Sequence, residues 1–424
     1  MDNNALLLLM GAKKSSKQTI GKAGQQGFGV GVYGGDPADL TTIGLSPMQG
    51  CESPASENYG NYIHTNGSVM VFIPAFCYRI GHTSAPSYSR DGANALEIRD
   101  ASLGQGDGWF LHRAFIDGGK QKLGFFVDKY LCSKKSDNPN IAVSVKNADQ
   151  ISLTNTSSYI NSSSMTGCSG LIYDAITLGR ARGEGYSCVS AFQWSALSIL
   201  SLACGQSATS ADNCAWYDAN HNTNFPKGSN NNCKDINDSS VTFSTHSRNL
   251  NFGKTGSGTP FAKTTHNGQA CGVADVNGCM FQPLLGIYQT SRSGTFAVVK
   301  ESYKMHDFTK DNYNTSSNFD TVDGFYNGSG RWGNGSNCAF STGSTNTERS
   351  MFGVFPVSSG ASGAGTSLFG NDLVSYPYYS TSVVLAAGRY NNGSNAGVWC
   401  RNGGYDYWGS DDYYAGFRSA GYAK

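Results

Sequence analysis

The chain has little charge and little proline. Charged residues make up 14% of its 424 residues, the formal net charge is +1, and there are only 11 prolines. A nearly neutral chain offers no electrostatic surface for nucleic acid. Its one concentrated positive run, four lysines between residues 13 and 22, is interpreted as a solvated N-terminal arm. We therefore expect no nucleic-acid partner.

A long apolar run is also missing from the N-terminus. The run there covers only residues 5–10, follows Asp2 and precedes lysines. It is too short to span a bilayer and lacks the basic leader of a secretory signal, so we expect no membrane insertion. We interpret residues 1–66 as an attachment or oligomerisation segment, with the leucine run docking onto a particle or a sister subunit. A short buried strand is the alternative for this run.

Patterns typical of metal and nucleophile sites are lacking as well. The 12 cysteines contain no C-x-x-C pair, and the seven histidines are scattered. Disulfides are possible for Cys204/Cys214 and Cys271/Cys279, but isolated buried thiols are the simpler interpretation. No catalytic residue, no metal ligand and no cofactor is predicted, and we expect that the chain is not an enzyme.

Glycine and aromatic residues are plentiful. The chain has 54 glycines and is 12% aromatic. Such glycine content predicts many loops and turns, while the aromatic side chains supply a core that a disordered chain lacks. The alternating stretch Gly27–Gly35 predicts a strand, and it lacks the context of a phosphate-binding loop.

The order of the regular elements can be predicted from apolar runs and caps. We expect strands at Val69–Pro74, Leu123–Tyr130 and Met280–Tyr288, and two helices, one at Leu171–Ala181 and one starting at Ser190 and stopping at Gly205. The second helix is announced by a capping box, with Gln193 three residues after Ser190. Residues 205–275 are predicted to be a surface insertion. Three side chains are assigned structural roles: Trp194 in the core, and Asp128 and Lys129 at a strand end.

The last thirty or so residues resemble a binding face. A Gly- and Asn-rich frame encloses aromatic and short polar side chains, the composition of an adaptable paratope. The expected ligand contacts are Tyr390, Trp399, Arg401, Tyr405, Asp406, Tyr407, Trp408, Ser410, Asp411, Asp412, Tyr413 and Tyr414. The expected fixed frame is Gly388, Asn392, Gly393, Gly397, Gly416, Phe417 and Arg418.

Two motifs in this region carry a family resemblance. The stretch from Gly388 to Gly397 and the closing Ala415-Gly416-Phe417-Arg418 resemble the borders of the variable region in the variable proteins of diversity-generating retroelements, of the phage tropism-determinant type. That family mutates adenines, and every residue between Gly403 and Tyr414 except Trp408 can be reached from an asparagine codon in this way. One departure is Ala387-Gly388 where the family has Gly-Gly.

The resemblance implies both a fold and a function. The fold would be α+β, a C-type lectin-like domain similar to the formylglycine-generating enzyme, over residues 67–424, loop-rich with small antiparallel sheets and two helices. The chain would be a receptor-binding protein of a phage tail tip or fibre, a virion component assembled in the host cytoplasm. Its partners would be a host surface receptor, protein or glycan, and other tail proteins through the N-terminus, with a trimer favoured as the oligomer.

Other functions of the same fold remain open as alternatives. A cellular surface adhesin or a metal-free carbohydrate-binding lectin would use the same face, whereas a calcium lectin is disfavoured because Gln282-Pro283 continues to Leu284, which cannot bind a hard cation. An enzyme related to the thiol oxidase of this fold is the remote alternative. That chemistry needs two neighbouring cysteines near the C-terminus, but Cys400 stands alone and the next one upstream is Cys338.

Overall fold

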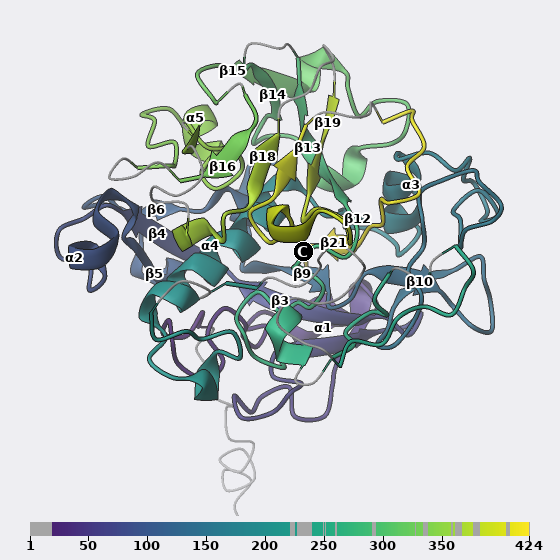
Figure 1. Ribbon diagram of the computed structural model, residues 1–424, viewed down its shortest axis with the longest axis horizontal. Helices are drawn as coiled ribbons and strands as arrows, with labels where there is room; N and C mark the ends of the chain where they lie inside the picture. The colour runs from purple at the N-terminus through teal and green to yellow at the C-terminus, as the bar shows by residue number, and fades with distance from the viewer. Residues whose placement is uncertain are drawn as a thin grey trace, which may run out of the picture.

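Two large β-sheets organise the chain. The computed structural model describes residues 19–220, 225–226, 240–248, 250, 252–258, 261–290, 294–326, 328–333, 338–357, 359–360, 367–375, 382–403 and 408–423. Figure 1 shows the two sheets one above the other, and the C-terminal part of the chain contributes strands to both. The architecture is mixed α+β, rich in small antiparallel sheets and poor in helices.

The six-stranded sheet is antiparallel throughout, in the order β1-β2-β3-β9-β21-β12. Its strands are β1 (Leu45–Pro47), β2 (Asn61–His64), β3 (Val69–Pro74), β9 (Gly124–Asp128), β12 (Tyr186–Cys188) and β21 (Ser419–Gly421). The last strand of the chain, β21, therefore lies inside this sheet, between β9 and β12.

The eight-stranded sheet has the order β15-β14-β13-β19-β20-β18-β16-β17, and only its β18·β20 pair is parallel among the described strands. Its strands are β13 (Gln282–Gln289), β14 (Phe296–Val299), β15 (Phe319–Val322), β16 (Gly330–Trp332), β17 (Ser359–Gly360), β18 (Leu373–Ser375), β19 (Ser382–Ala386) and β20 (Arg401–Asn402).

Smaller elements complete the fold. A three-stranded sheet contains β4 (Phe76–Ile80), β5 (Leu96–Asp100) and β6 (Phe110–Leu111), and two hairpins pair β7 (Ile116–Asp117) with β8 (Lys120–Gln121) and β10 (Cys132–Lys134) with β11 (Ala142–Ser144). The helices are α1 (Pro37–Thr42), α2 (Tyr88–Asp91), α3 (Asp174–Arg180), α4 (Ala191–Ser207) and α5 (Asn346–Ser350). None of the described helices is long and apolar enough to cross a membrane.

Helix α4 is the central helix of the core. It contacts β13 and β5, and 16 of its 17 residues are buried, so it needs no polar face. Its serines still satisfy their hydroxyls: Ser195, Ser198 and Ser201 donate to carbonyl oxygens three or four residues earlier in the same helix. The predicted capping box is present, because Ser190 Oγ accepts from the Gln193 amide and Gln193 Oε1 accepts from the Ser190 amide.

Most of the predicted elements are confirmed. The predicted strand Val69–Pro74 is β3 with the same bounds, the second strand is β9, and the third is β13. Both helices are present, although α3 starts at Asp174 and α4 continues two residues past Gly205. Trp194 is fully buried, as predicted.

The strand predicted at Gly27–Gly35 is wrong. Residues 24–29 form consecutive turns, and Gly27 and Gly29 have φ of +78° and +79°, which extended strands do not use. The alternation of small and apolar residues instead buries Phe28 and Val30 in the main core. Alternation predicts the burial pattern here and not the backbone conformation.

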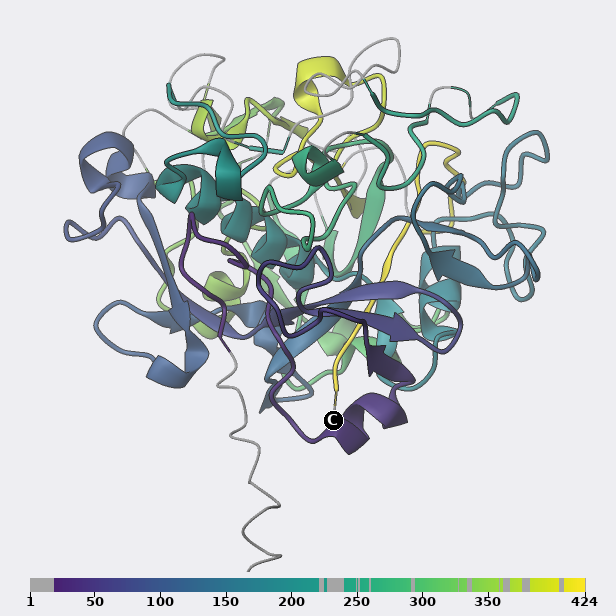
Figure 2. The ribbon, with the colours of Figure 1, turned by 90° about the horizontal axis from the view of Figure 1, so that it is seen from below.

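The boundary predicted at residue 66 falls between two paired strands. β2, before this boundary, forms a hydrogen-bonded ladder with β3, after it. Phe28 and Val30 also belong to the same core cluster as Trp194 and Phe417. Residues 19–66 are therefore packed as part of the main fold. At the other end of the chain, Ala423 clusters with Leu40 and Ile43, which places the last described residue beside α1 (Figure 2).

The predicted surface insertion at 205–275 is corrected over its second half. His266 and Asn267 are fully buried, and the Asn267 amide donates to the Phe28 carbonyl oxygen at 2.8 Å. His266 contacts the Gly29 carbonyl oxygen at 3.2 Å, and burial lowers its pKa to about 4, so the ring is neutral. The polar composition of this stretch predicted a surface position. These polar residues are buried because the turns near the N-terminus supply their hydrogen-bond partners.

A buried ionic network lies at the end of β9, within the six-stranded sheet. Asp128, at the end of β9, accepts from both terminal nitrogens of Arg182 at 2.6 and 2.9 Å, and from the Ser419 amide of β21 at 2.7 Å. Both partners of this ion pair are buried almost completely. Asp128 was predicted to have a structural role. In the fold it joins β9 to the start of β21 and to Arg182 through hydrogen bonds.

Replacing Phe417 with alanine should destabilise the whole fold. Phe417 is 1% exposed and belongs to the main core, so its truncation is expected to lower the free energy of unfolding by about 3 kcal/mol. Denaturant unfolding measures this loss. Leu123→Ala is the control, because Leu123 is 48% exposed and should cost no more than about 0.5 kcal/mol. Equal effects of the two variants would contradict the core position of Phe417.

Candidate binding face

The predicted binding region starts with a loop closed at its base. The loop follows β19, and the Gly397 amide donates to the Ala387 carbonyl oxygen at 2.9 Å. Asn392 Oδ1 accepts from the Arg389 amide at 2.8 Å, and a short 3₁₀ turn covers Gly393–Asn395. These bonds use the backbone and one asparagine, so the path of the loop depends little on its other side chains.

Glycine is required at two points of this loop. Gly388 has φ of +81°, and a Cβ there would lie 2.9 Å from Ala396 Cα. A Cβ at Gly397 would lie 2.2 Å from the Asp372 carboxylate, which also accepts from the Trp399 amide. Ala387 has φ of +72°, a conformation that favours glycine, and this is the position at which the chain departs from the Gly-Gly pair of the family it resembles.

Two expected ligand contacts are core residues instead. Trp399 is 1% exposed and packs against three aromatic rings, Trp332, Phe340 and Phe369, with centroids 4.8 to 5.7 Å away. Arg401 is fully buried and donates five hydrogen bonds, four to the carbonyl oxygens of Val354, Val398, Cys400 and Gly353 and one to Ser198 Oγ. Their assignment as ligand contacts is corrected, because neither side chain reaches solvent.

The assignment of Trp408 as a ligand contact is also corrected. It is 3% exposed and packs on Tyr313 at 5.4 Å, while its carbonyl oxygen accepts from the Tyr173 amide. The Ser410 carbonyl oxygen accepts from the Ile172 amide in the same way. Trp408 therefore anchors the second half of the region to the segment before α3. Of the other expected contacts, Tyr405, Asp406 and Tyr407 lie outside the described residues.

The segment from 408 to 418 is held from two sides. Leu153 and Asp412 form an antiparallel bridge, and the Leu153 amide donates to the Ala415 carbonyl oxygen. On the other side, Phe281 and Ala415 form a parallel bridge. Thr154 Oγ1 donates to Asp411 Oδ2 at 2.9 Å, and Asp412 Oδ1 accepts from the Tyr414 amide at 2.8 Å. The backbone is fixed, and the side chains of residues 409–414 remain at least partly exposed.

Four tyrosines gather on this frame, and we refer to Tyr159, Tyr390, Tyr413 and Tyr414 as the tyrosine cluster. Tyr413 stacks on Tyr159 at 4.7 Å and tilts against Tyr414 at 3.9 Å, and Tyr390 lies 5.7 Å from Tyr414. All four are half-buried. Together they present a continuous aromatic surface that is rigid and partly open to solvent.

Polar contacts fix the cluster further. Tyr413 Oη donates to Tyr414 Oη at 2.8 Å, and the Arg389 guanidinium lies 4.1 Å from the Tyr414 ring centroid. Burial raises the pKa of the Tyr414 phenol, and the hydrogen bond with Tyr413 raises it further, so it stays protonated at neutral pH. The cluster is thus an aromatic surface with the guanidinium of Arg389 over the ring of Tyr414.

Sequence reasoning missed Tyr159 and Arg389 as members of this face. Tyr159 is far from the C-terminal region in sequence, and Arg389 was included only as part of the loop motif. The one local signal was that Tyr159 is an isolated aromatic residue in a stretch of Ser, Thr and Asn. Apart from Ile160, its neighbours from Asn155 to Ser164 are polar, so a partner for its ring is expected from elsewhere in the fold.

The frame residues sit where the loop enters and leaves the sheets. Phe417 lies in the core, and Arg418 is fully buried with its guanidinium donating to four carbonyl oxygens and to Gln282 Oε1. Gly416 leaves room for Met280, whose sulfur would lie 3.1 Å from an added Cβ.

A contact between a serine and a histidine lies in the core. The structure brings Ser195 and His112 within 3.1 Å, but both are buried and burial lowers the pKa of His112 to about 3. His112 Nδ1 accepts from the Ala114 amide, which assigns the ring proton to Nε2, the nitrogen facing Ser195. This histidine cannot take a proton from the serine. Among the described residues, no group of three His, Cys, Asp or Glu side chains could hold a metal ion.

The described cysteines are all free. Cys204 and Cys214 lie in hydrogen-bonding contact, yet they are unbonded, as are Cys271 and Cys279. Cys233 lies outside the described residues. Both pairs are therefore buried free thiols and not disulfides.

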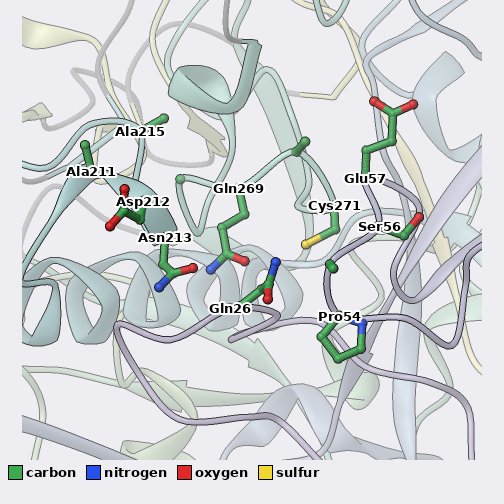
Figure 3. A pocket seen from close by; sticks show the side chains of 13 residues that line it. Gln26, Pro54, Ser56, Glu57, Ala211, Asp212, Asn213, Ala215, Gln269 and Cys271 are labelled. Atoms are coloured by element: carbon green, nitrogen blue, oxygen red, sulfur yellow. The ribbon is translucent and has the colours of Figure 1, made fainter.

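A polar hollow of about 280 Å³ lies elsewhere on the chain and shares no residue with the tyrosine cluster. Figure 3 shows Asn213 and Gln269 on one side of it and Cys271 and Pro54 on the other. Gln269 is already engaged, because it accepts from the Gly27 amide and donates to the Gln25 carbonyl oxygen. Burial raises the pKa of the Cys271 thiol, so it is no activated nucleophile.

Truncation of Trp399 tests whether this side chain belongs to the core or to the candidate binding face. Trp399→Ala should lower the free energy of unfolding by about 3–5 kcal/mol, because it empties the centre of an aromatic cluster. The half-exposed Tyr413 should cost no more than about 1 kcal/mol on truncation. Chemical denaturation of the two variants gives the comparison. A small loss of unfolding free energy for Trp399→Ala would contradict the core position of Trp399.

Comparison with known proteins finds a weak structural similarity. No protein-family model matches it, and no curated protein matches it. A solved structure, "Major Tropism Determinant U1 Variant", is similar over 84% of this chain, with 13% sequence identity and a TM-score of 0.27. The match covers 63% of that protein, so this chain spans less than two thirds of its length.

Proposed function

We propose that the chain is a receptor-binding protein of a phage tail or a related particle, and that it recognises host surface ligands through the tyrosine cluster together with residues 405–407 and 410–412. The scaffold would be a C-type lectin-like domain, as the motifs from Gly388 to Gly397 and from Ala415 to Arg418 imply. The single observation that carries the proposal is a partly exposed aromatic surface on a backbone fixed by main-chain hydrogen bonds.

The chemistry of the face supports recognition. Tyrosine offers a large contact area at a small cost in side-chain entropy, and Ser410, Asp411 and Asp412 beside it supply adjustable hydrogen bonds. A face that must change its specificity needs a backbone that tolerates substitutions. The closed loop and the bridges at Asp412 and Ala415 provide this tolerance, since their bonds join main-chain atoms.

Particle attachment and oligomerisation through the N-terminus belong to the same proposal. Residues 1–18, which include the leucine run, lie outside the described residues, and residues 19–66 pack within the main fold. The partners would be other tail proteins and sister subunits, with a trimer favoured, and the site of action would be the virion.

A metal-free carbohydrate-binding lectin, or a cellular adhesin, is the second candidate. Partly exposed tyrosine rings beside the carboxylates of Asp411 and Asp412 are chemically suited to a sugar ring and its hydroxyls. Binding to host cells before and after enzymatic removal of their glycans distinguishes a protein receptor from a glycan receptor.

Removal of two cluster tyrosines should abolish host attachment without unfolding the protein. Aromatic anchors contribute about 2 kcal/mol or more each to binding, so Tyr159→Ala with Tyr413→Ala should weaken cell binding by well over tenfold. The melting temperature should change little, because both rings are half-buried. Tyr88→Ala, a half-buried tyrosine on α2, is the matched control. Unchanged binding by a folded double variant would refute the proposed site.

Chelator and thiol alkylation should leave attachment nearly unchanged. Binding through aromatic and hydrogen-bonding contacts needs neither a metal nor a thiolate, so both treatments of the native protein should alter affinity by less than about threefold. Cell-binding assays in EDTA and after iodoacetamide measure this directly. A calcium lectin would lose its ligand bridge in EDTA, and a thiol enzyme would lose its nucleophile to iodoacetamide. A large loss in either treatment would favour one of those classes instead.

A further inference from the structure

A second hollow, of about 230 Å³, opens between the three-stranded sheet and the segment that leads into α5. Its lining includes Tyr78 on β4, Phe110 on β6, and Ser341, Thr342 and Arg349 from the α5 region. Figure 1 shows β4, β6 and α5 on the same side of the molecule. No residue of the tyrosine cluster lines this hollow. Any ligand bound here would therefore be separate from the proposed receptor contact.

One wall of the hollow is aromatic. Tyr78 is 3% exposed and stacks on Phe352 with centroids 3.9 Å apart, so its position is fixed by the core. Phe110 is 36% exposed and lies 6.2 Å from Tyr78. An exposed ring at the mouth of a hollow, supported by a fixed ring behind it, forms a platform for the apolar face of a cyclic ligand.

The charge of the hollow comes mainly from Arg349. Its guanidinium lies 4.8 Å from the Phe110 ring centroid, and two of its five N–H donors bond to the Gly343 carbonyl oxygen and to Asn346 Oδ1. Arg349 forms no ion pair within the part of the chain that the structure describes. The second arginine in the lining, Arg79, is neutralised by Glu97 at 2.7 Å.

The carboxylate of Glu348, which precedes Arg349 in the sequence, is bound by Thr345. Glu348 Oε2 accepts from the Thr345 amide at 3.0 Å and from Thr345 Oγ1 at 2.9 Å, which completes the N-terminal cap of α5. These hydrogen bonds from Thr345 hold the pKa of Glu348 below its ordinary value, and the charge of Arg349 adds a smaller effect. Three N–H donors of the Arg349 guanidinium therefore remain without a partner among the described residues.

We propose that this hollow binds a sugar ring that carries a carboxylate. Arg349 would pair with the carboxylate, Phe110 would cover the apolar face of the ring, and the hydroxyls of Ser341 and Thr342 would bond to ring hydroxyls. The volume is below the roughly 300 Å³ at which drug-sized sites begin, which suits one ring and excludes a long chain. This inference is independent of the proposed receptor site.

A matched pair of probes tests the charge. Methyl β-D-glucuronide and methyl β-D-glucoside share the ring and differ in the carboxylate, and the full chain is titrated with each by ligand-observed NMR. We expect millimolar binding of the glucuronide, and binding of the glucoside weaker by about tenfold or more, since one charge-assisted bond is lost. Equal binding of both probes, or no binding of the glucuronide at up to about 20 mM, would overturn the proposal.

Variants locate the binding. Arg349→Gln should weaken glucuronide binding by about tenfold or more, and Thr342→Trp, at an exposed position, should block the hollow for either probe. Lys120→Gln, an exposed cation on β8, is the control for net charge. The Tyr159/Tyr413 double variant should bind the glucuronide like the parent chain, which separates this site from the receptor face. Glucuronide binding that survives both Arg349→Gln and Thr342→Trp would sink the assignment.

Discussion

Arg418 links the two large sheets through one buried guanidinium. It donates to the carbonyl oxygens of Asp128 and Lys129 at the end of β9, and to Gln282 Oε1 at the start of β13. A buried cation is costly unless every donor is satisfied, and here the five bonds compensate for the burial. Because Arg418 directly precedes β21, the same contacts fix where the C-terminal segment leaves the binding face. One side chain therefore ties the end of β9, the start of β13 and the C-terminal segment together.

Local signals in the sequence were sufficient for elements whose partners are near in the chain. The cap at Ser190 and Gln193 is a contact within four residues, and β3 is an unbroken apolar run; both were predicted correctly. Prediction failed where a residue's partner is distant. Asn267 is polar and was assigned to the surface, but its partner is the Phe28 carbonyl oxygen, 239 residues away in sequence. Composition cannot show such a pairing, because it depends on how the turns near the N-terminus meet the core.

The candidate binding face shows the same limit. Trp399 and Tyr413 are both aromatic residues in a Gly- and Asn-rich stretch, and nothing local distinguishes them. Trp399 is buried because Trp332 and two phenylalanines surround it, whereas the half-buried Tyr413 contacts Tyr159 and its neighbour Tyr414. The motifs could predict the turns and the closing bond of the loop, which involve glycine and the backbone. They could not predict which side chains turn inward, since this is decided by residues that are tens to hundreds of positions away.

The free thiols have a consequence for the life of the protein outside a reducing compartment. Burial raises the pKa of Cys132, Cys188 and Cys271, among others, so the folded chain presents little thiolate to an oxidant. Unfolding would expose the 11 described thiols at once, and random disulfides would then trap the chain in scrambled forms that cannot refold. In an oxidising medium, the durability of this protein is therefore governed by its rate of unfolding, because each opening event carries the risk of an irreversible cross-link.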